Sequence, residues 1–228
     1  MLEITGDDIA ALKDEDLRTL VGRLSEEEVR RRNLTLSAVT WGGHQDAKDG
    51  GLDVRVALAP GTSIDGFVPK PSTGFQVKTS DMPPAAIGHE MKPKGVLRPV
   101  IVQLADVSGA YVIVSSKASV SDSALQSRRR AMANAARDCP GAAGLTLEFY
   151  DRNRIATWVR DAGLIQWVRS KLGKSWSGWR LYGSWAHTPE GADQTFLVDD
   201  AAIIRTGDRD DGDGLSATEG INKIRTAR

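Results

Sequence analysis

Three polar side chains stand inside two segments whose alternating pattern predicts β-strands. Asp53 lies near the start of LDVRVAL, and Gln76 and Lys78 lie in GFQVKTS. If these strands pair about 5 Å apart, their polar rows share one face and the three side chains come close together. A carboxylate with other oxygen ligands suits a hard cation such as Mg²⁺, and an adjacent ammonium can orient water and stabilise charge on a phosphate. The spacing therefore favours phosphodiester hydrolysis.

An ordinary ion pair between Asp53 and Lys78 explains the same spacing. Such a cross-strand pair on a solvated face contributes at most about 1 kcal/mol to stability. By spacing alone the two interpretations carry equal weight, so the choice between them depends on the surrounding elements and motifs.

The elements around these strands alternate between helix and strand. A helical stripe of leucines and valines runs from Asp14 to Arg32, and Ser25 could cap a local restart of that helix with Glu28. Further strands are predicted for LSAVTW, RPVIVQLA, GAYVIVSS and LTLEFY. Further helices are predicted for PPAAIGHEM, SDSALQSRRRAMANAARDC and RIATWVRDAGLIQWVRSKLG, the last with a break at Gly163. This order predicts an α/β fold with a central mixed β-sheet flanked by α-helices.

Composition excludes several classes of protein. The 228 residues carry 30 basic and 30 acidic side chains, so a DNA-binding surface would have to be a local patch. The single cysteine, Cys139, excludes an internal disulfide and a cysteine-based zinc cluster. The chain has neither the pattern of a signal peptide nor the roughly 20 consecutive apolar residues that cross a bilayer. We therefore expect a cytoplasmic protein without a membrane partner.

The runs DGGLDV and GFQVK, with RLSEEEV upstream, resemble the Mrr-like branch of the PD-(D/E)XK restriction-endonuclease superfamily. The resemblance implies a restriction-endonuclease-like fold that hydrolyses double-stranded DNA with Mg²⁺, or Mn²⁺, and with little sequence specificity. It implies that Asp53 binds the metal, that Gln76 replaces a second acidic ligand, and that Lys78 is the catalytic lysine. Glu28 is the best match to the metal-binding acid that the family carries on its first helix.

The acid on the first helix has alternatives. Glu26 and Glu27 differ from Glu28 only in the helical face that they occupy. An amide oxygen at Gln76 can bind Mg²⁺ without adding negative charge, and an acid from the helix would make up that deficit. Asp49 is either a further acid near the site or, more often for an aspartate before Gly-Gly, a turn former.

Residues 173–228 are rich in Trp, Gly and Ser and then in charged residues. We predict a nuclease domain over residues 1–172 and a Trp-rich extension and linker over residues 173–228. The runs GWRLYGSWA and GINKIR resemble the N-terminal region of bacterial antiviral STAND-type NTPases, in which an Mrr-like nuclease precedes an ATPase. The resemblance implies an effector domain that acts as a homo-oligomer when joined to its NTPase, because a double-strand cut needs at least two sites.

Basic residues that could contact DNA phosphates lie in and before one predicted helix. They are Lys117, Arg128, Arg129 and Arg130. Such side chains supply the sequence-independent part of DNA binding. A charge run on a helix is more often a solvated face, so the alternative is that these residues only face water.

A catalytically degenerate nuclease fold is the main alternative for function. Gln76 and the net charge of zero favour it slightly. Such a protein would bind nucleic acid or support oligomerisation without cleaving. A purely structural adaptor, which binds neither DNA nor metal, is a third possibility. Tryptophans do not decide the question, because Trp158 and Trp167 lie beside apolar residues and are predicted to pack in the core rather than to stack on bases.

Overall fold

The computed structural model describes residues 3–42, 52–174, 203–204, 215–216 and 219. The chain divides into two compact units, Met1–Trp179 and Arg180–Arg228. In the second unit the described residues form two short antiparallel strands, β6 (Ile203–Ile204) and β7 (Leu215–Ser216). The other described elements all belong to the first unit.

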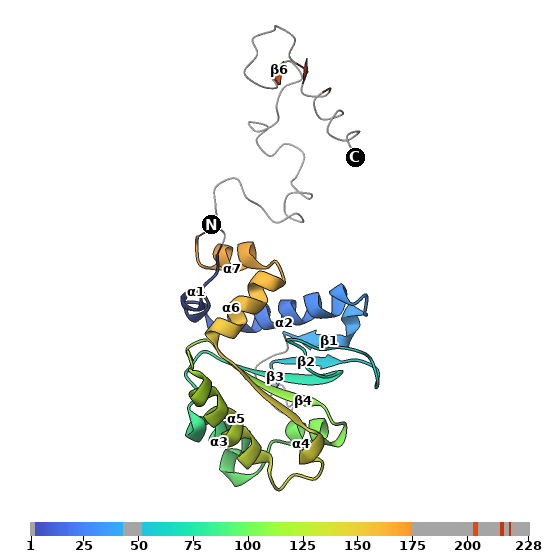
Figure 1. Cartoon of the computed structure of the whole chain (residues 1–228), viewed down its shortest axis with the longest axis vertical. Helices are drawn as coiled ribbons and strands as arrows, with labels where there is room; N and C mark the ends of the chain where they lie inside the picture. The colour runs from blue at the N-terminus through green and yellow to red at the C-terminus, as the bar shows by residue number, and fades with distance from the viewer. Residues whose placement is uncertain (1–2, 43–51, 175–202, 205–214, 217–218, 220–228) are drawn as a thin grey trace. The chain divides into compact units, whose positions relative to one another are not determined.

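A five-stranded sheet in the order β1-β2-β3-β4-β5 forms the centre of the first unit. Its strands are β1 (Val39–Trp41), β2 (Val54–Ala57), β3 (Ser72–Lys78), β4 (Ala110–Ser115) and β5 (Thr146–Tyr150). Strands β1, β2 and β3 pair antiparallel, whereas β3 with β4 and β4 with β5 pair parallel. The sheet is therefore mixed, as predicted (Figure 1).

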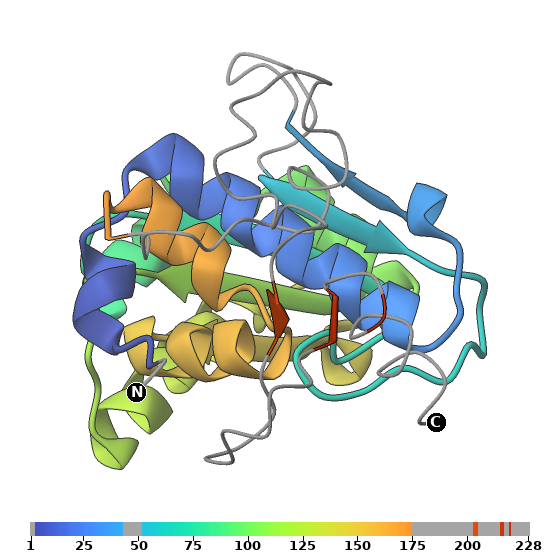
Figure 2. The same ribbon diagram turned by 90° about the horizontal axis from the view of Figure 1, so that it is seen from above.

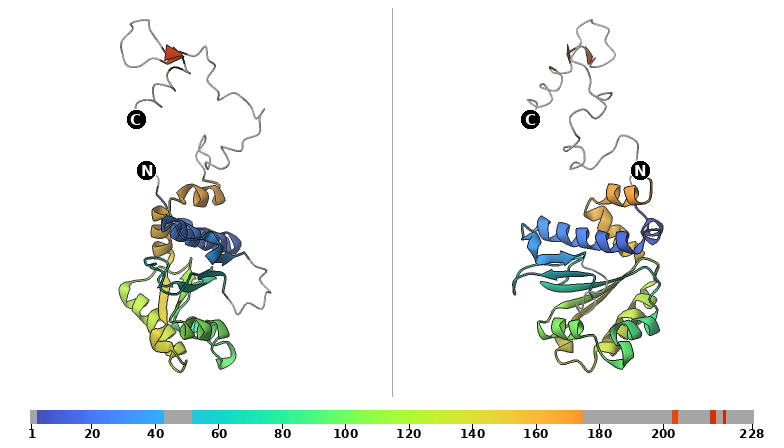
Figure 3. Two further views of the ribbon diagram at one scale, coloured as in Figure 1. Left: turned by 90° about the vertical axis from the view of Figure 1, so that its right-hand side faces the viewer. Right: turned by 180° about the vertical axis from the view of Figure 1, so that it is seen from behind.

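Helices cover both faces of this sheet, which confirms the predicted α/β class. One layer contains α1 (Gly6–Ala10), α2 (Asp14–Arg31), α6 (Arg152–Asp161) and α7 (Ile165–Lys171), which lie together on the near side in Figure 2. The other contains α3 (Pro84–Met91), α4 (Pro99–Asp106) and α5 (Asp122–Ala136), seen on the opposite side in Figure 3. Short 3₁₀ turns are η1 (Leu36–Ala38), η2 (Pro93–Gly95) and η3 (Ala142–Gly144). None of the helices within the described residues is long and apolar enough to span a membrane.

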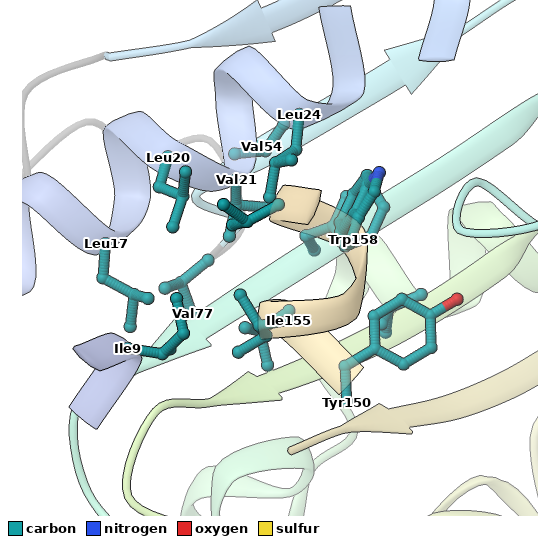
Figure 4. Close-up of a cluster of buried hydrophobic side chains, with 14 of the residues drawn as sticks. Ile9, Leu17, Leu20, Val21, Leu24, Val54, Val77, Tyr150, Ile155 and Trp158 are labelled. Carbon is teal, nitrogen blue, oxygen red and sulfur yellow. The ribbon is translucent and has the colours of Figure 1, made fainter. Parts of the chain in front are cut away.

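The first layer packs through the apolar stripe predicted for the first helix. The buried side chains of α2 that Figure 4 labels are Leu17, Leu20, Val21 and Leu24. They meet Val54 and Val77 from the strands and Ile155 and Trp158 from α6. The indole of Trp158 stacks on the ring of Phe67 with centroids 5.1 Å apart. The predicted burial of Trp158 and Trp167 is confirmed.

The predicted strand RPVIVQLA is wrong, because this segment forms α4. Pro99 occupies the first turn of the helix, where a missing N–H costs nothing. The buried residues of α4 recur with helical spacing: Val100, Ile101, Leu104 and Ala105. A short apolar run is compatible with a buried strand and with a buried helix. In this protein the packing of the segment against the sheet determines that it is a helix.

Helix α2 does not restart at Ser25, contrary to the prediction. It is continuous, and the Ser25 hydroxyl donates a hydrogen bond to the carbonyl of Val21 at 2.9 Å. A serine in a helix interior commonly bonds the preceding turn in this way. The predicted break at Gly163 is confirmed, since this residue separates α6 from α7 with φ of 72°.

Candidate active site

Asp53 precedes the first residue of β2 and reaches across to β3. Its Oδ2 accepts hydrogen bonds from the main-chain N–H of Val77 at 2.7 Å and from Nε2 of Gln76 at 2.9 Å. Because β2 begins at Val54, the carboxylate bonds an N–H that a longer strand would have bonded through its backbone. The sheet itself thus fixes the position of the Asp53 side chain, in contact with Gln76 as the sequence predicted.

Positive charge approaches the other oxygen of Asp53. Nε of Arg18, on α2, lies 3.3 Å from Oδ1, and Arg18 also pairs with Asp14 one turn earlier. Burial raises the pKa of the Asp53 carboxyl, although the hydrogen bond from Val77 and the charges of Arg18 and Lys78 act in the opposite direction. The carboxylate therefore stands in a desolvated place where additional positive charge would stabilise its ionised form.

The side-chain oxygen of Gln76 has no hydrogen-bond partner within the described part of the chain. The side chain is 6% exposed, and its Nε2 is already donated to Asp53, which directs Oε1 elsewhere. An unsatisfied buried polar atom costs about 1–3 kcal/mol. Such an oxygen atom beside a carboxylate indicates a binding site for a ligand to which both can donate a lone pair, such as a cation.

Lys78 lies two residues after Gln76 on β3 and therefore shares its face of the sheet. Its Nζ lies 3.0 Å from Oε2 of Glu90, which is on α3. Glu90 and its partner Arg98 were missed by sequence reasoning. Their spacing carries no motif, and Glu90 meets Lys78 only through the packing of α3, which lies against α5 in this layer.

The hydroxyl of Tyr111, on β4, is another of the buried polar atoms that have no hydrogen-bond partner among the described residues. Burial raises the pKa of this hydroxyl; the negative charge of Glu90 raises it further, Arg98 opposes that, and Asp53 adds to it. The hydroxyl is thus within electrostatic reach of both carboxylates. Gln76 and Tyr111 mark one polar region that the described residues leave unsatisfied.

Glu28 lies apart from this region, contrary to the prediction. Its Oε1 accepts from Nε1 of Trp158 at 3.0 Å, and its Oε2 pairs with Arg32 at 2.7 Å. Glu28 follows Arg18, the α2 residue that contacts Asp53, by ten positions, or about 15 Å along the helix. The carboxylate of Glu28 satisfies the buried indole of Trp158, which is a role in the core.

The alternative acids on α2 do not contact Asp53 either. Glu26 accepts a hydrogen bond from Nε1 of Trp41 at 2.8 Å, and Glu27 pairs with Arg30. Asp49 falls outside the described residues, so its predicted role stays a prediction.

The predicted DNA-contacting residues of α5 divide into different environments. Arg128 is buried; its Nε donates to the carbonyl of Met82 at 3.0 Å and its Nη2 to Asp81 at 2.9 Å. These contacts hold α5 to the segment after β3. The prediction that Arg128 contacts a DNA phosphate is therefore wrong. Arg129 pairs with Glu148 at 2.5 Å.

Two of the predicted basic residues remain on the surface. Lys117 is exposed and its Nζ donates to the carbonyl of Ala10 at 2.7 Å. Arg130 is exposed on α5. Both stay candidates for contact with DNA.

A metal at this site would have few protein ligands. No group of three or more His, Cys, Asp or Glu residues that could hold a metal is found where the structure is described. The donors at hand are the Asp53 carboxylate and the unpartnered Gln76 oxygen. Both are hard oxygen ligands, and they fit Mg²⁺, which usually keeps several waters and takes only one or two carboxylates.

Comparisons with known proteins do not extend this picture. No family model matches the chain, and no curated protein or solved structure matches it.

Proposed function

We propose that the first unit is a metal-dependent endonuclease that hydrolyses phosphodiester bonds of double-stranded DNA. One observation carries the proposal: the buried, unpartnered oxygen of Gln76 lies beside the Asp53 carboxylate, on the sheet face that also carries Lys78. An acid, an amide oxygen and an ammonium converging there are the groups that phosphodiester hydrolysis with Mg²⁺ needs.

The topology supports the restriction-endonuclease-like class as part of this proposal. The resemblance implies the order helix, three strands, helix, strand. The chain has α2, then the antiparallel strands β1, β2 and β3, then α3 and α4, and then β4 parallel to β3. In this order Asp53 directly precedes β2 and Lys78 ends the adjacent strand β3.

Each residue has a separate role in the proposed reaction. Asp53 and Gln76 would hold Mg²⁺ or Mn²⁺ through their side-chain oxygens. The bound cation would supply positive charge at the phosphate and lower the pKa of a coordinated water. Lys78 orients the attacking water and stabilises the negative charge that develops on the phosphate.

The resemblance to antiviral STAND-type NTPases extends the proposal to partners. The nuclease would act as an effector that its NTPase brings together in several copies. The 228-residue chain has a net charge of zero, which favours weak binding by one copy alone, because sequence-independent binding of DNA depends on neutralising phosphates. Clustering would raise the effective concentration of sites on one duplex.

A plasmid cleavage assay tests the proposal. Supercoiled DNA is incubated with the protein in Mg²⁺ or Mn²⁺, alone and joined to a STAND-type NTPase module that brings several copies together. Asp53→Ala and Lys78→Ala should each lower the rate by at least about 100-fold, because each removes a group that meets the reacting phosphate or its metal. Lys171→Ala, which removes a lysine paired with Asp16 in the first layer, should cleave as the wild type does. Cleavage that survives either Asp53→Ala or Lys78→Ala would contradict the assignment.

A catalytically inactive DNA-binding module is the second candidate. The approach of Arg18 to Asp53 favours it, because a guanidinium beside the carboxylate competes with a cation for the same oxygen. This candidate predicts binding of duplex DNA, measured by fluorescence anisotropy, with no cleavage in any metal or in the joined protein.

A further inference from the structure

We propose that Glu90 is a positioning residue for Lys78, and that Arg98 holds Glu90 in the orientation this requires. The inference rests on the proposed nuclease function and adds to it two residues that no sequence motif indicated.

Both oxygens of the Glu90 carboxylate are engaged, each by a different cation. Oε2 lies 3.0 Å from Nζ of Lys78, and Oε1 accepts from Nη2 of Arg98 at 2.8 Å. Lysine has a flexible four-carbon stem, and fixing it costs up to about 2 kcal/mol of side-chain entropy. A carboxylate anchored on its far side can hold the ammonium in one direction, so that this cost is met on folding and not on binding substrate.

Arg98 anchors Glu90 at two points. Besides its bond to the carboxylate, Nε of Arg98 donates to the main-chain carbonyl of Glu90 at 2.7 Å. The main-chain N–H of Arg98 also bonds the carbonyl of Met91, the last residue of α3. These bonds satisfy carbonyls that the end of a helix leaves without partners. The position of Glu90 is therefore fixed by the backbone around it as well as by charge.

Two further observations link this cluster to the Asp53 site. Lys78 and Gln76 occupy the same face of β3, and the unpartnered hydroxyl of Tyr111 responds to the charges of both Glu90 and Asp53. Two cations against one carboxylate also leave Lys78, Glu90 and Arg98 with one net positive charge. An anionic phosphate at Asp53 would meet that charge.

The pair between Arg129 and Glu148 provides a matched control. It also joins an arginine and a glutamate that are partly buried, and its helix, α5, lies in the same layer as α3. Neither residue has a contact with Lys78 or Asp53 among the interactions described above. Glu148→Gln therefore reports what losing a comparable ion pair does to the fold alone.

The test combines kinetics with a double-mutant cycle. Glu90→Gln should lower kcat for plasmid cleavage about 10- to 100-fold, the usual effect of removing a residue that orients an active group, while KM for DNA stays unchanged. Glu148→Gln should change neither. In the Lys78→Ala background Glu90→Gln should cost nothing further, because the ammonium that it positions is gone. Glu90→Asp should recover part of the lost rate.

A second readout does not depend on cleavage. In the metal-free protein with ¹⁵N-labelled lysines, the Nζ signal of Lys78, identified by its loss in Lys78→Arg, should be visible in the wild type and in Glu148→Gln. It should disappear in Glu90→Gln, where fast hydrogen exchange replaces the ion pair. Folding of each variant is checked by circular dichroism.

Each failure has its own signature. If the wild type cleaves and Glu90→Gln cleaves equally well or faster, the positioning role is overturned while the nuclease function stands. If the two losses in the cycle simply add, Glu90 acts independently of Lys78 and the inference is overturned. If the wild type cleaves in no metal and in no joined form, the nuclease function fails and the positioning role fails with it.

Discussion

Two acidic residues, the buried Glu28 and the partly buried Asp53, show how a core and a candidate site differ. Each oxygen of Glu28 has one partner, the indole N–H of Trp158 or the guanidinium of Arg32. Asp53 is also bonded, but beside it the oxygen of Gln76 is buried without a partner. Burial of an acid is therefore a poor guide to function. An unsatisfied polar neighbour is a better one, because folding alone gives no reason to leave it.

The two faces of the sheet differ in the groups that they carry. The face under α2 and α6 is filled mainly by apolar side chains; the hydroxyl of Tyr150 in this layer donates to the carbonyl of Phe67, whereas Nε2 of Gln166 is buried without a partner among the described residues. The face under α3 and α4 carries the unpartnered Tyr111 hydroxyl and the ion pairs of Glu90. The second face therefore differs from the first mainly in the charged groups that gather around Lys78.

Among the predicted effects on stability, the replacement of Glu28 should have the largest. Glu28→Gln removes the charge that pairs with Arg32 and weakens the bond to Trp158, so we expect the free energy of unfolding to fall by about 1–3 kcal/mol. Urea denaturation measures this loss. Cleavage per folded molecule should stay unchanged; a stable Glu28→Gln protein without activity would place Glu28 in the site and break the comparison.

Addition of Mg²⁺ should have a smaller effect on stability, and this effect should depend on Asp53 but not on Glu28. A cation that binds only the folded protein stabilises it by about 1.4 kcal/mol at ten times its dissociation constant. Differential scanning calorimetry should therefore show a rise in Tm for the wild type and for Glu28→Gln, and none for Asp53→Asn. Equal shifts in all three proteins would mean that the cation binds elsewhere.

The pH dependence of stability gives the smallest expected effect. Because burial raises the pKa of Asp53 above its value in the unfolded chain, the folded protein binds more protons and loses stability as pH rises through that interval. Without divalent cations, the stability of Asp53→Asn relative to the wild type should therefore increase from pH 4 to pH 6, measured by urea denaturation at each pH.

Asp8 provides a control of opposite sign for this experiment. Burial alone would raise the pKa of Asp8, but hydrogen bonds from Lys174 and Thr5 bring it below its usual value. The wild type should therefore gain stability relative to Asp8→Asn as pH rises up to the ordinary pKa of an aspartate, and the difference should level off above that pH. The same slope for both variants would show that the titration of Asp53 is not the cause.

Much of the fold follows from local pattern. The stripe of α2, the strands β2 to β5 and the break at Gly163 could all be predicted, because hydrophobic periodicity and turn residues act over a few residues. The segment from Pro99 to Asp106 was misread because its apolar run is compatible with two kinds of element. None of the candidate site residues lies in this segment, so the wrong prediction did not affect the site.

Only part of the candidate site could be predicted from the sequence. Asp53 and Gln76 could be placed together because paired strands bring their side chains onto one face, and the structure has them in contact. Glu28 was misplaced because a family motif names a residue type on a helix without giving its position along the axis. Glu90 could not be found at all, since its contact with Lys78 depends on how α3 packs against α5, which lies far along the chain.

The sequence by itself determined most of the alternation of helices and strands, and it put Asp53 and Gln76 at positions where neighbouring strands bring them together. Only the tertiary structure decided which acids serve the core and which stand beside the site. The reason is physical: backbone periodicity is a local property, whereas the partners of a buried charge come from whichever elements fold against it. Trp158 for Glu28 and Arg98 for Glu90 are such partners.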